Sequence, residues 1–148
     1  MTERATNKNI TEMPTGGATI LVVEDDADVR EMVVGMLSEL GYRTLTASAG
    51  QEALAVLERE KSVDLLFADV VMPAGMNGSE LARHASRLRP GIKVLLSSGF
   101  TREENRYRLA RAEYPFISKP YRPAILAKKL RDVLSEGVAG RTDRARAD

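Results

Sequence analysis

Hydrophobic and polar positions along the chain follow two alternating patterns. Short apolar runs such as Ile20 to Val23 are too brief for a helix and are typical of buried strands. Between such runs, apolar residues recur at helical spacing, as they do from Val29 to Leu40. Strands are expected at 20–23, 42–47, 63–68, 92–96 and 116–117, with helices beginning near 29, 48, 79, 101 and 123. This alternation predicts an α/β fold, a doubly wound five-stranded parallel sheet with about five helices.

The two ends of the chain lack this pattern. Residues 1–17 are polar and aperiodic, and residues 137–148 alternate Arg, Ala and Asp, so both are expected to be flexible tails. The predicted folded domain therefore spans residues 18–136. Because the chain ends soon after the last expected helix, we expect a stand-alone domain with no attached DNA-binding domain.

Composition excludes several classes of protein. The 22 Lys+Arg against 21 Asp+Glu leave a net charge of +1, which argues against general nucleic-acid or membrane binding. The absence of Cys excludes disulfides, thiolate nucleophiles and zinc–thiolate sites, and a single His excludes a His-rich metal site. No apolar run approaches the roughly 20 residues of a membrane span, and no signal-peptide core is present. We therefore expect a cytoplasmic protein.

Polar residues stand where the predicted strands end. Glu24-Asp25-Asp26 follows the first strand, Asp69 the third, Ser98 the fourth and Lys119 the fifth. Carboxyl ends of parallel strands share one edge of the sheet, and ligands bind there near the switch in strand order. With the flavodoxin-like order 2-1-3-4-5, the acidic ends of the first and third strands lie side by side, and the second strand, which ends without a charge, lies outside.

A cluster of carboxylates at one edge needs a counterion, because like charges raise each other's pKa and cost stability. Oxygen ligands without His or Cys point to Mg²⁺. Lys119 adds a fixed positive charge, so the pocket suits a phosphoryl group. In that pocket Asp69 could act as a nucleophile toward phosphorus, and the Ser98 hydroxyl could donate to a phosphoryl oxygen.

These residues resemble the motifs of a response-regulator receiver domain of two-component signalling. The similarity spans residues 19–135, and four separate motifs in the right order, each behind a predicted strand, carry it. They are Leu21-Val22-Val23-Glu24-Asp25-Asp26, Asp69-Val70-Val71-Met72-Pro73, Ser97-Ser98-Gly99 and Ser118-Lys119-Pro120.

The resemblance implies a role for each site residue. Asp69 would accept a phosphoryl group from a histidine kinase or a histidine phosphotransfer protein and become an aspartylphosphate. Asp25, Glu24, Asp69 and the Val71 carbonyl would bind Mg²⁺. Lys119 would pair with the phosphoryl group, while Ser98 and Phe116 would form the switch that follows phosphorylation. Self-catalysed phosphorylation and slow autodephosphorylation, a downstream protein target, and a monomer or weak dimer are further expectations.

The chain departs from the family pattern in two loops. Ala74-Gly75 adds a residue between Met-Pro and the following Met-x-Gly, near the side where a kinase docks. Gly99 replaces the more common Ala, and Phe100 follows it, so either Phe100 or Phe116 could be the switch aromatic. The Arg-rich helix expected at 101–112 has a thin apolar stripe, which predicts low local stability.

Two other functions fit the same fold. A phosphorylation-independent interaction module would be expected to lack some acidic or Lys residues of the site, and none is missing. A small aspartyl-phosphate hydrolase would need an acidic residue two positions after its nucleophile, and here that residue is Val71. The sequence therefore favours the receiver, and it identifies neither the cognate kinase, the target nor the direction of phosphate flow.

Overall fold

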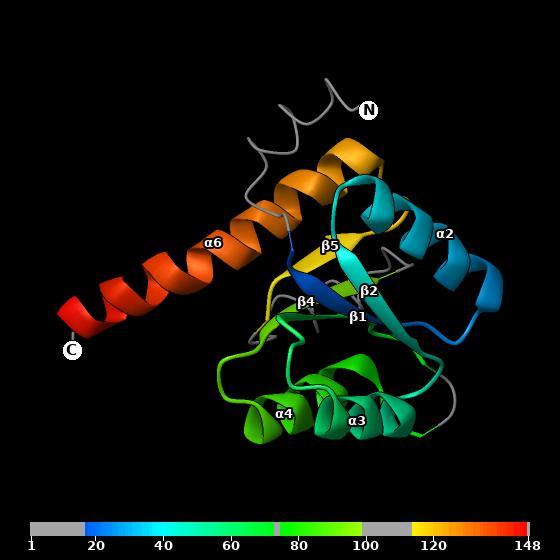
Figure 1. Cartoon of the computed structure of the whole chain (residues 1–148), viewed down its shortest axis with the longest axis horizontal. Helices are drawn as coiled ribbons and strands as arrows, with labels where there is room; N and C mark the ends of the chain where they lie inside the picture. Colours follow the sequence, from blue (N-terminus) through cyan, green and yellow to red (C-terminus); the bar gives the residue numbers. More distant parts are fainter. Residues whose placement is uncertain (1–16, 73–74, 99–113, 148) are drawn as a thin grey trace.

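A five-stranded parallel sheet forms the centre of the computed structural model (Figure 1). The structure describes residues 17–72, 75–98 and 114–147. The strands are β1 (Thr19–Val23), β2 (Arg43–Ala47), β3 (Leu65–Asp69), β4 (Lys93–Ser98) and β5 (Phe116–Ser118). The helices are α2 (Ala27–Glu39), α3 (Gly50–Arg59), α4 (Gly78–Leu88) and α6 (Pro123–Ala147). The Arg-rich helix predicted at 101–112 lies outside the described residues.

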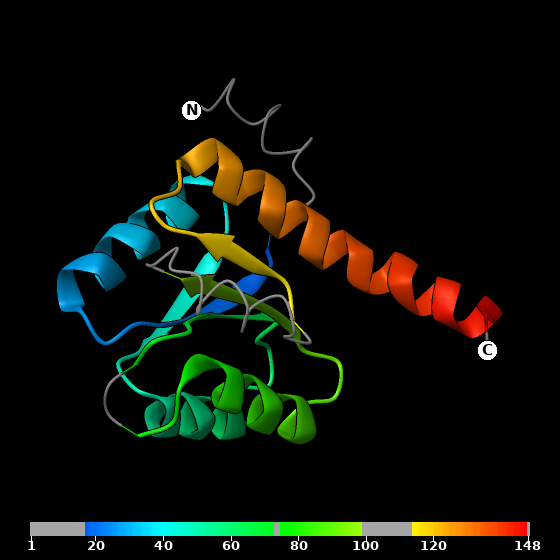
Figure 2. The same cartoon turned by 180° about the vertical axis from the view of Figure 1, so that it is seen from behind.

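The strand order is β2-β1-β3-β4-β5, and every pairing is parallel, which confirms the predicted fold. Two helices, α2 and α6, cover one face of the sheet, and α3 and α4 cover the other (Figures 1 and 2). Among the described residues, no helix combines the length and hydrophobicity of a membrane span.

The core is divided by the sheet into two layers. Because successive strand side chains point to opposite faces, Leu21 and Val23 of β1 pack under α3 and α4, while Ile20 and Val22 pack under α2 and α6. The central strand β3 alternates in the same way. Each of these strands is apolar on both faces, as a sheet covered by helices on both sides requires.

Side chains at the helix starts fix where the loops turn. Asp26 caps α2 by accepting hydrogen bonds from the N–H groups of Asp28 and Val29. Asn77 and Glu80 form a full capping box at α4. Ser48 and Gln51 have the spacing of a capping box and predict one at α3, but this prediction is wrong. The Ser48 N–H and hydroxyl both donate to Glu52, at 2.8 and 2.9 Å. The N-cap of α3 is Ala49, one residue later than a Ser48 cap requires, so the Glu52 carboxylate reaches Ser48 instead.

The last helix is longer than the sequence predicts. Pro123 is its first residue, as expected from the fixed φ of proline. A flexible tail was expected from residue 137, whereas α6 continues to Ala147 and projects past the sheet (Figure 2). The helix lacks an apolar stripe there, but Ala and Arg are strong helix formers and no Pro interrupts the segment. The division into one domain and two tails stays a prediction.

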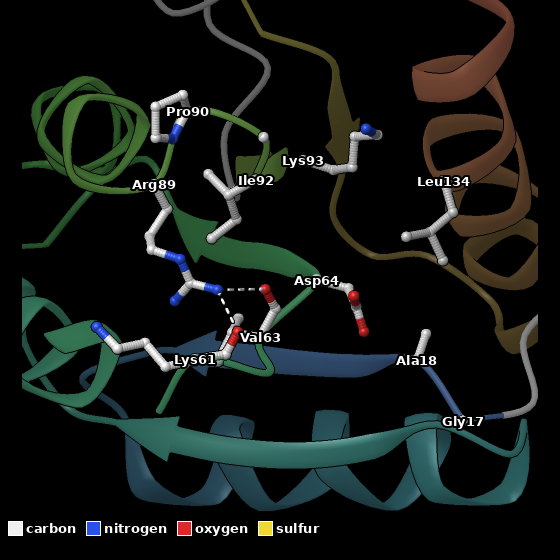
Figure 3. Close-up of a pocket in the computed structure, with 11 residues that line it drawn as sticks. Gly17, Ala18, Lys61, Val63, Asp64, Arg89, Pro90, Ile92, Lys93 and Leu134 are labelled. Carbon is white, nitrogen blue, oxygen red and sulfur yellow. Dashed lines mark hydrogen bonds between the residues drawn. The ribbon is translucent and has the colours of Figure 1, made fainter. Parts of the chain in front are cut away.

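A cavity of about 700 Å³ opens at the amino ends of the strands, opposite the predicted site. Arg89 lines it and directs its guanidinium toward the loop between α3 and β3 (Figure 3). There it donates to the carbonyl of Glu60 at 3.0 Å and to that of Lys61, with longer contacts to Leu57 and Val63. The Leu57 carbonyl lies in the last turn of α3 and the other three follow the helix end, where backbone carbonyls lack partners within the helix. One side chain therefore closes α3 and fixes the entry to β3.

We expect Arg89→Ala to lower the free energy of unfolding by about 2 kcal/mol, because a charged donor to several carbonyls is lost. Urea unfolding followed by circular dichroism measures the change. Arg83→Ala removes an exposed Arg from the middle of α4 and should change stability by less than about 0.5 kcal/mol. Equal effects of the two substitutions would show that the carbonyl contacts of Arg89 contribute no stability.

Candidate functional site

The polar residues that follow the strands meet at the carboxyl edge of the sheet. Asp69 is the last residue of β3, the central strand, which pairs with β1 on one side and β4 on the other. Glu24 and Asp25 follow β1 directly, and Lys119 follows β5. The sheet topology thus brings together four residues from three strand ends that are distant in the sequence.

Glu24, Asp25 and Asp69 form an acidic cluster. One carboxylate oxygen from each of the three residues can be chosen so that the three oxygens lie within 4.8 Å of one another. Glu24 and Asp69 are buried, with 6% and 8% of their surface exposed, whereas Asp25 is exposed. The cluster is therefore open to solvent on the Asp25 side and enclosed by protein on the other.

Lys119 bridges the two buried carboxylates. Its Nζ lies 3.1 Å from Asp69 Oδ2 and 3.3 Å from Glu24 Oε1. Burial works against the charge on Lys119, but the two carboxylates outweigh it and raise the pKa of its ammonium group. The pKa of Glu24 is also raised, chiefly because burial disfavours its charged form, with a further contribution from the negative charge of Asp69. The ammonium is therefore held charged, while the acidic cluster carries more negative charge than this one cation compensates.

Backbone groups orient both buried carboxylates. The N–H of Asp26 donates to Glu24 Oε2 at 3.1 Å, and the N–H of Val71 donates to Asp69 Oδ1 at 3.2 Å. Asp69 Oδ2 is the oxygen that faces Lys119. These contacts leave the carboxylates with defined directions, which a reaction at one chosen oxygen requires.

The remaining predicted site residues lie on β4, on β5 and after β3. Ser98, the last residue of β4, is 1% exposed, and its neighbour Ser97 is the register partner of Asp69. The N–H of Lys119 donates to the Ser98 carbonyl at 2.8 Å, which links the two residues through the backbone. Phe116 on β5 packs against the core layer under α3 and α4, and the Val71 side chain is exposed. Gly99, Phe100 and Ala74 lie outside the described residues.

Sequence reasoning missed two residues beside this site. Tyr121 contacts Phe67, with ring centroids 6.1 Å apart, and its pKa is raised to about 12 by burial and then by the charges of Glu24 and Asp69. Gly78, at the start of α4, donates its N–H to the Val70 carbonyl at 3.0 Å. A Cβ on Gly78 would lie 2.3 Å from the Asp69 carbonyl oxygen. In the sequence, Tyr121 is marked only by its position two residues after Lys119, and Gly78 only by its position at the start of a predicted helix.

The donor set of the acidic cluster fits a hard divalent cation. Three carboxylates supply only oxygen ligands, which Mg²⁺ prefers, and the exposed side of the cluster leaves room for the water molecules that Mg²⁺ retains. Soft metals that prefer sulfur or imidazole find no such ligand among these residues.

Comparisons with known proteins identify the family of this chain. The family model of the response regulator receiver domain matches residues 20–131, so the chain belongs to the receiver-domain family of two-component signalling. The response regulator receiver protein CpdR of Brucella abortus is 35% identical over 119 residues, which cover 79% of this chain and 91% of CpdR. The sensor kinase CckA of the same organism is 36% identical over 124 residues, 82% of this chain.

A solved structure of a response regulator has the same fold. The response regulator TrrA of Thermotoga maritima, in complex with Mg²⁺-BeF, superposes with a TM-score of 0.68 at 28% identity. The match covers 78% of this chain and 98% of that one. In contrast, the chain spans only 13% of the length of the kinase CckA, because the match is confined to one part of that longer protein.

We expect Gly78→Ala to destabilise the protein by about 1–3 kcal/mol, because the added methyl group meets the backbone of Asp69 and cannot be accommodated without a shift. Gly35→Ala on the exposed side of α2, where a Cβ meets nothing within 4 Å, should instead stabilise by about 0.5–1 kcal/mol. Urea unfolding measures both changes. A neutral or stabilising Gly78→Ala would contradict the close packing of α4 against Asp69.

Proposed function

We propose that this receiver domain accepts a phosphoryl group on Asp69 in a Mg²⁺-dependent reaction. The observation that carries the proposal is the position of the Asp69 carboxylate between the Lys119 ammonium and the acidic pair Glu24 and Asp25. A nucleophilic carboxylate, a fixed cation and a set of oxygen ligands for a metal are the parts that phosphoryl transfer needs. The TrrA relative, which was solved with Mg²⁺-BeF, supports the same reading.

In the proposed reaction an Asp69 carboxylate oxygen attacks the phosphorus of a phosphohistidine in line with the P–N bond. As the new O–P bond forms, the P–N bond breaks, and its electron pair stays on the imidazole nitrogen, which takes a proton. Lys119 already contacts Asp69 Oδ2, so its ammonium can bind the transferred phosphoryl oxygens without a large movement. Val71, two positions after Asp69, offers no side-chain acid or base, which fits slow autodephosphorylation.

Mg²⁺ would be held by Asp25, Glu24, Asp69 and the Val71 carbonyl. When bound, Mg²⁺ supplies positive charge that neutralises the phosphoryl oxygens during transfer. Asp69 therefore serves both as a ligand and as the modified residue. The Val71 N–H, which donates to Asp69 Oδ1, keeps that carboxylate in one orientation for both tasks.

The switch that reports phosphorylation is proposed to involve Ser98 and Phe116. The Ser98 hydroxyl would donate to the phosphoryl group and draw the end of β4 toward Asp69. Because the Ser98 carbonyl accepts a hydrogen bond from Lys119, this movement is transmitted to the end of β5. Phe116, the first residue of β5, pairs with Leu96 of β4 and is placed to respond.

Receiver domains interact with histidine kinases, and we propose that a histidine kinase or a histidine phosphotransfer protein is the donor here. We further propose that the domain acts without an attached output domain, in the cytoplasm, as a monomer or weak dimer. Its signal would then pass to a downstream protein target by direct contact. The extent of the CpdR match, nearly the full length of that receiver protein, supports this organisation.

We expect the protein to gain the mass of one phosphoryl group when incubated with acetyl phosphate and Mg²⁺, because a small donor can approach the cluster from its solvent-exposed Asp25 side. Intact mass spectrometry measures the adduct, and Asp69→Asn should abolish it. Asp132→Asn, which removes an exposed carboxylate on α6, is the matched control and should leave the adduct unchanged. An adduct that persists in Asp69→Asn would place the modification elsewhere and overturn the proposal.

We also expect Mg²⁺ to stabilise the protein, because the folded state alone assembles the three carboxylates. At 100 times its Kd the gain is about 2.7 kcal/mol. Thermal unfolding with Mg²⁺ and with EDTA measures it. Asp25→Asn should remove most of this gain, whereas Asp26→Asn, which keeps a good helix cap, should retain it. Equal loss in both variants would indicate that general negative charge, rather than a defined site, binds the cation.

A further inference from the structure

Arg30 occupies a position that helix formation alone does not favour. It lies near the start of α2, where the helix dipole is positive and a cation is disfavoured. The side chain is half-buried and turns back toward the carboxyl edge of the sheet, where its guanidinium Nη1 donates to the Glu24 carbonyl at 2.7 Å. This contact, shorter than a typical neutral hydrogen bond, accounts for a cation at an otherwise unfavourable position.

The carbonyl that Arg30 holds belongs to the peptide unit between Glu24 and Asp25, the two acidic residues after β1. On the same residue the Glu24 N–H donates to the Ala47 carbonyl at 3.1 Å, which ties the loop to β2. Glu24 therefore has both of its backbone groups bound, one by β2 and one by Arg30. Within the described residues the Asp25 carboxylate has no hydrogen-bond partner, so its position depends on this backbone.

A second acidic residue lies behind Arg30. The pKa of Glu52 is lowered mainly by hydrogen bonds from the Ser48 N–H and hydroxyl, and the charge of Arg30 lowers it further. Arg30 is thus attracted to the start of α3 as well as bound to the β1–α2 loop. The one hydrogen bond of its guanidinium among the described residues is to the Glu24 carbonyl, and its charge acts on Glu52 from farther away.

We infer that Arg30 is a positioning residue for Mg²⁺: its guanidinium fixes the peptide between Glu24 and Asp25, and so holds the Asp25 carboxylate where the cation binds. The inference rests on the proposed function, because it concerns the same metal site. Substitution of a residue that orients a metal ligand, without itself binding the metal, typically weakens metal affinity by about 10–100-fold.

The two possible roles of Arg30, as a nearby positive charge and as a positioning residue, predict opposite effects of its removal on Mg²⁺ affinity. If Arg30 acted only as a nearby positive charge, its removal would reduce repulsion and tighten Mg²⁺ binding. If it positions Asp25, its removal weakens binding even though the site becomes more negative. The direction of the change therefore separates the two roles, and loss of overall stability alone would not alter the affinity of the molecules that remain folded.

The test is Mg²⁺ titration of Arg30→Met by isothermal calorimetry, at a temperature where circular dichroism shows the variant folded. We expect the Kd to rise about tenfold. Arg59→Met is the matched control, because Arg59 also contributes to the low pKa of Glu52, and Glu24 is not among its hydrogen-bond partners in the described part of the chain. Its Kd should change less than twofold. An unchanged or lower Kd in Arg30→Met, or an equal rise in both variants, would overturn the inference.

A measurement on the unchanged protein covers the case in which Arg30→Met does not fold. In a Mg²⁺ titration followed by NMR, the Arg30 side-chain N–H signal and the Asp25 amide signal should shift together with one Kd. An Arg30 signal that stays fixed while the Asp25 amide shifts would overturn the inference alone. If the unchanged protein binds no Mg²⁺ by either method, the proposed function fails, and the inference fails with it.

Discussion

The structure depends on an imbalance of charge at one edge of a buried sheet. Glu24 and Asp69 lose most of their contact with water, and within the described part of the chain a single ammonium, that of Lys119, is placed between them. Burial of like charges opposes folding, so the packed apolar layers must offset the destabilisation that the site causes. A second cation would relieve this imbalance, which is the physical reason to propose a metal site beside a phosphoryl site here.

The parallel sheet separates the chemistry from the structural reinforcement. Carboxyl ends of the strands carry the acidic cluster, while the amino ends carry the Arg89 contacts that close α3. Apolar side chains of β1 and β3 on both faces hold the two ends at a fixed separation. Each end is therefore able to change without disturbing the other, as long as the core layers remain packed.

The fold and the principal residues of the site could be predicted because both depend on local patterns. Short apolar runs alternating with helical periodicity define the sheet, and polar residues at strand ends point to Asp69, Asp25 and Lys119. The prediction failed where the exact start of a helix decides which side chains meet. Gln51 and Glu52 are equally plausible partners for Ser48 by sequence, and only the position of the helix start selects Glu52.

Other features carried no sequence signal of their own. An Arg at the start of a helix reads as a solvent-exposed charge, yet Arg30 reaches a carbonyl six residues earlier in the chain. Gly78 reads as an ordinary loop Gly, although the backbone of Asp69 leaves no space for a side chain there. Helix α6 continues to Ala147, beyond the point where apolar periodicity stops.

Lys119 is shared between two acceptors at nearly equal distances, 3.1 and 3.3 Å. An ammonium group shared in this way cannot move closer to Asp69 without weakening its contact with Glu24, and the reverse also holds. New negative charge on Asp69 would thus release Glu24 at the same moment. A change of charge at the end of β3 would therefore alter the contacts at the end of β1 through the Lys119 side chain alone, without a movement of any helix.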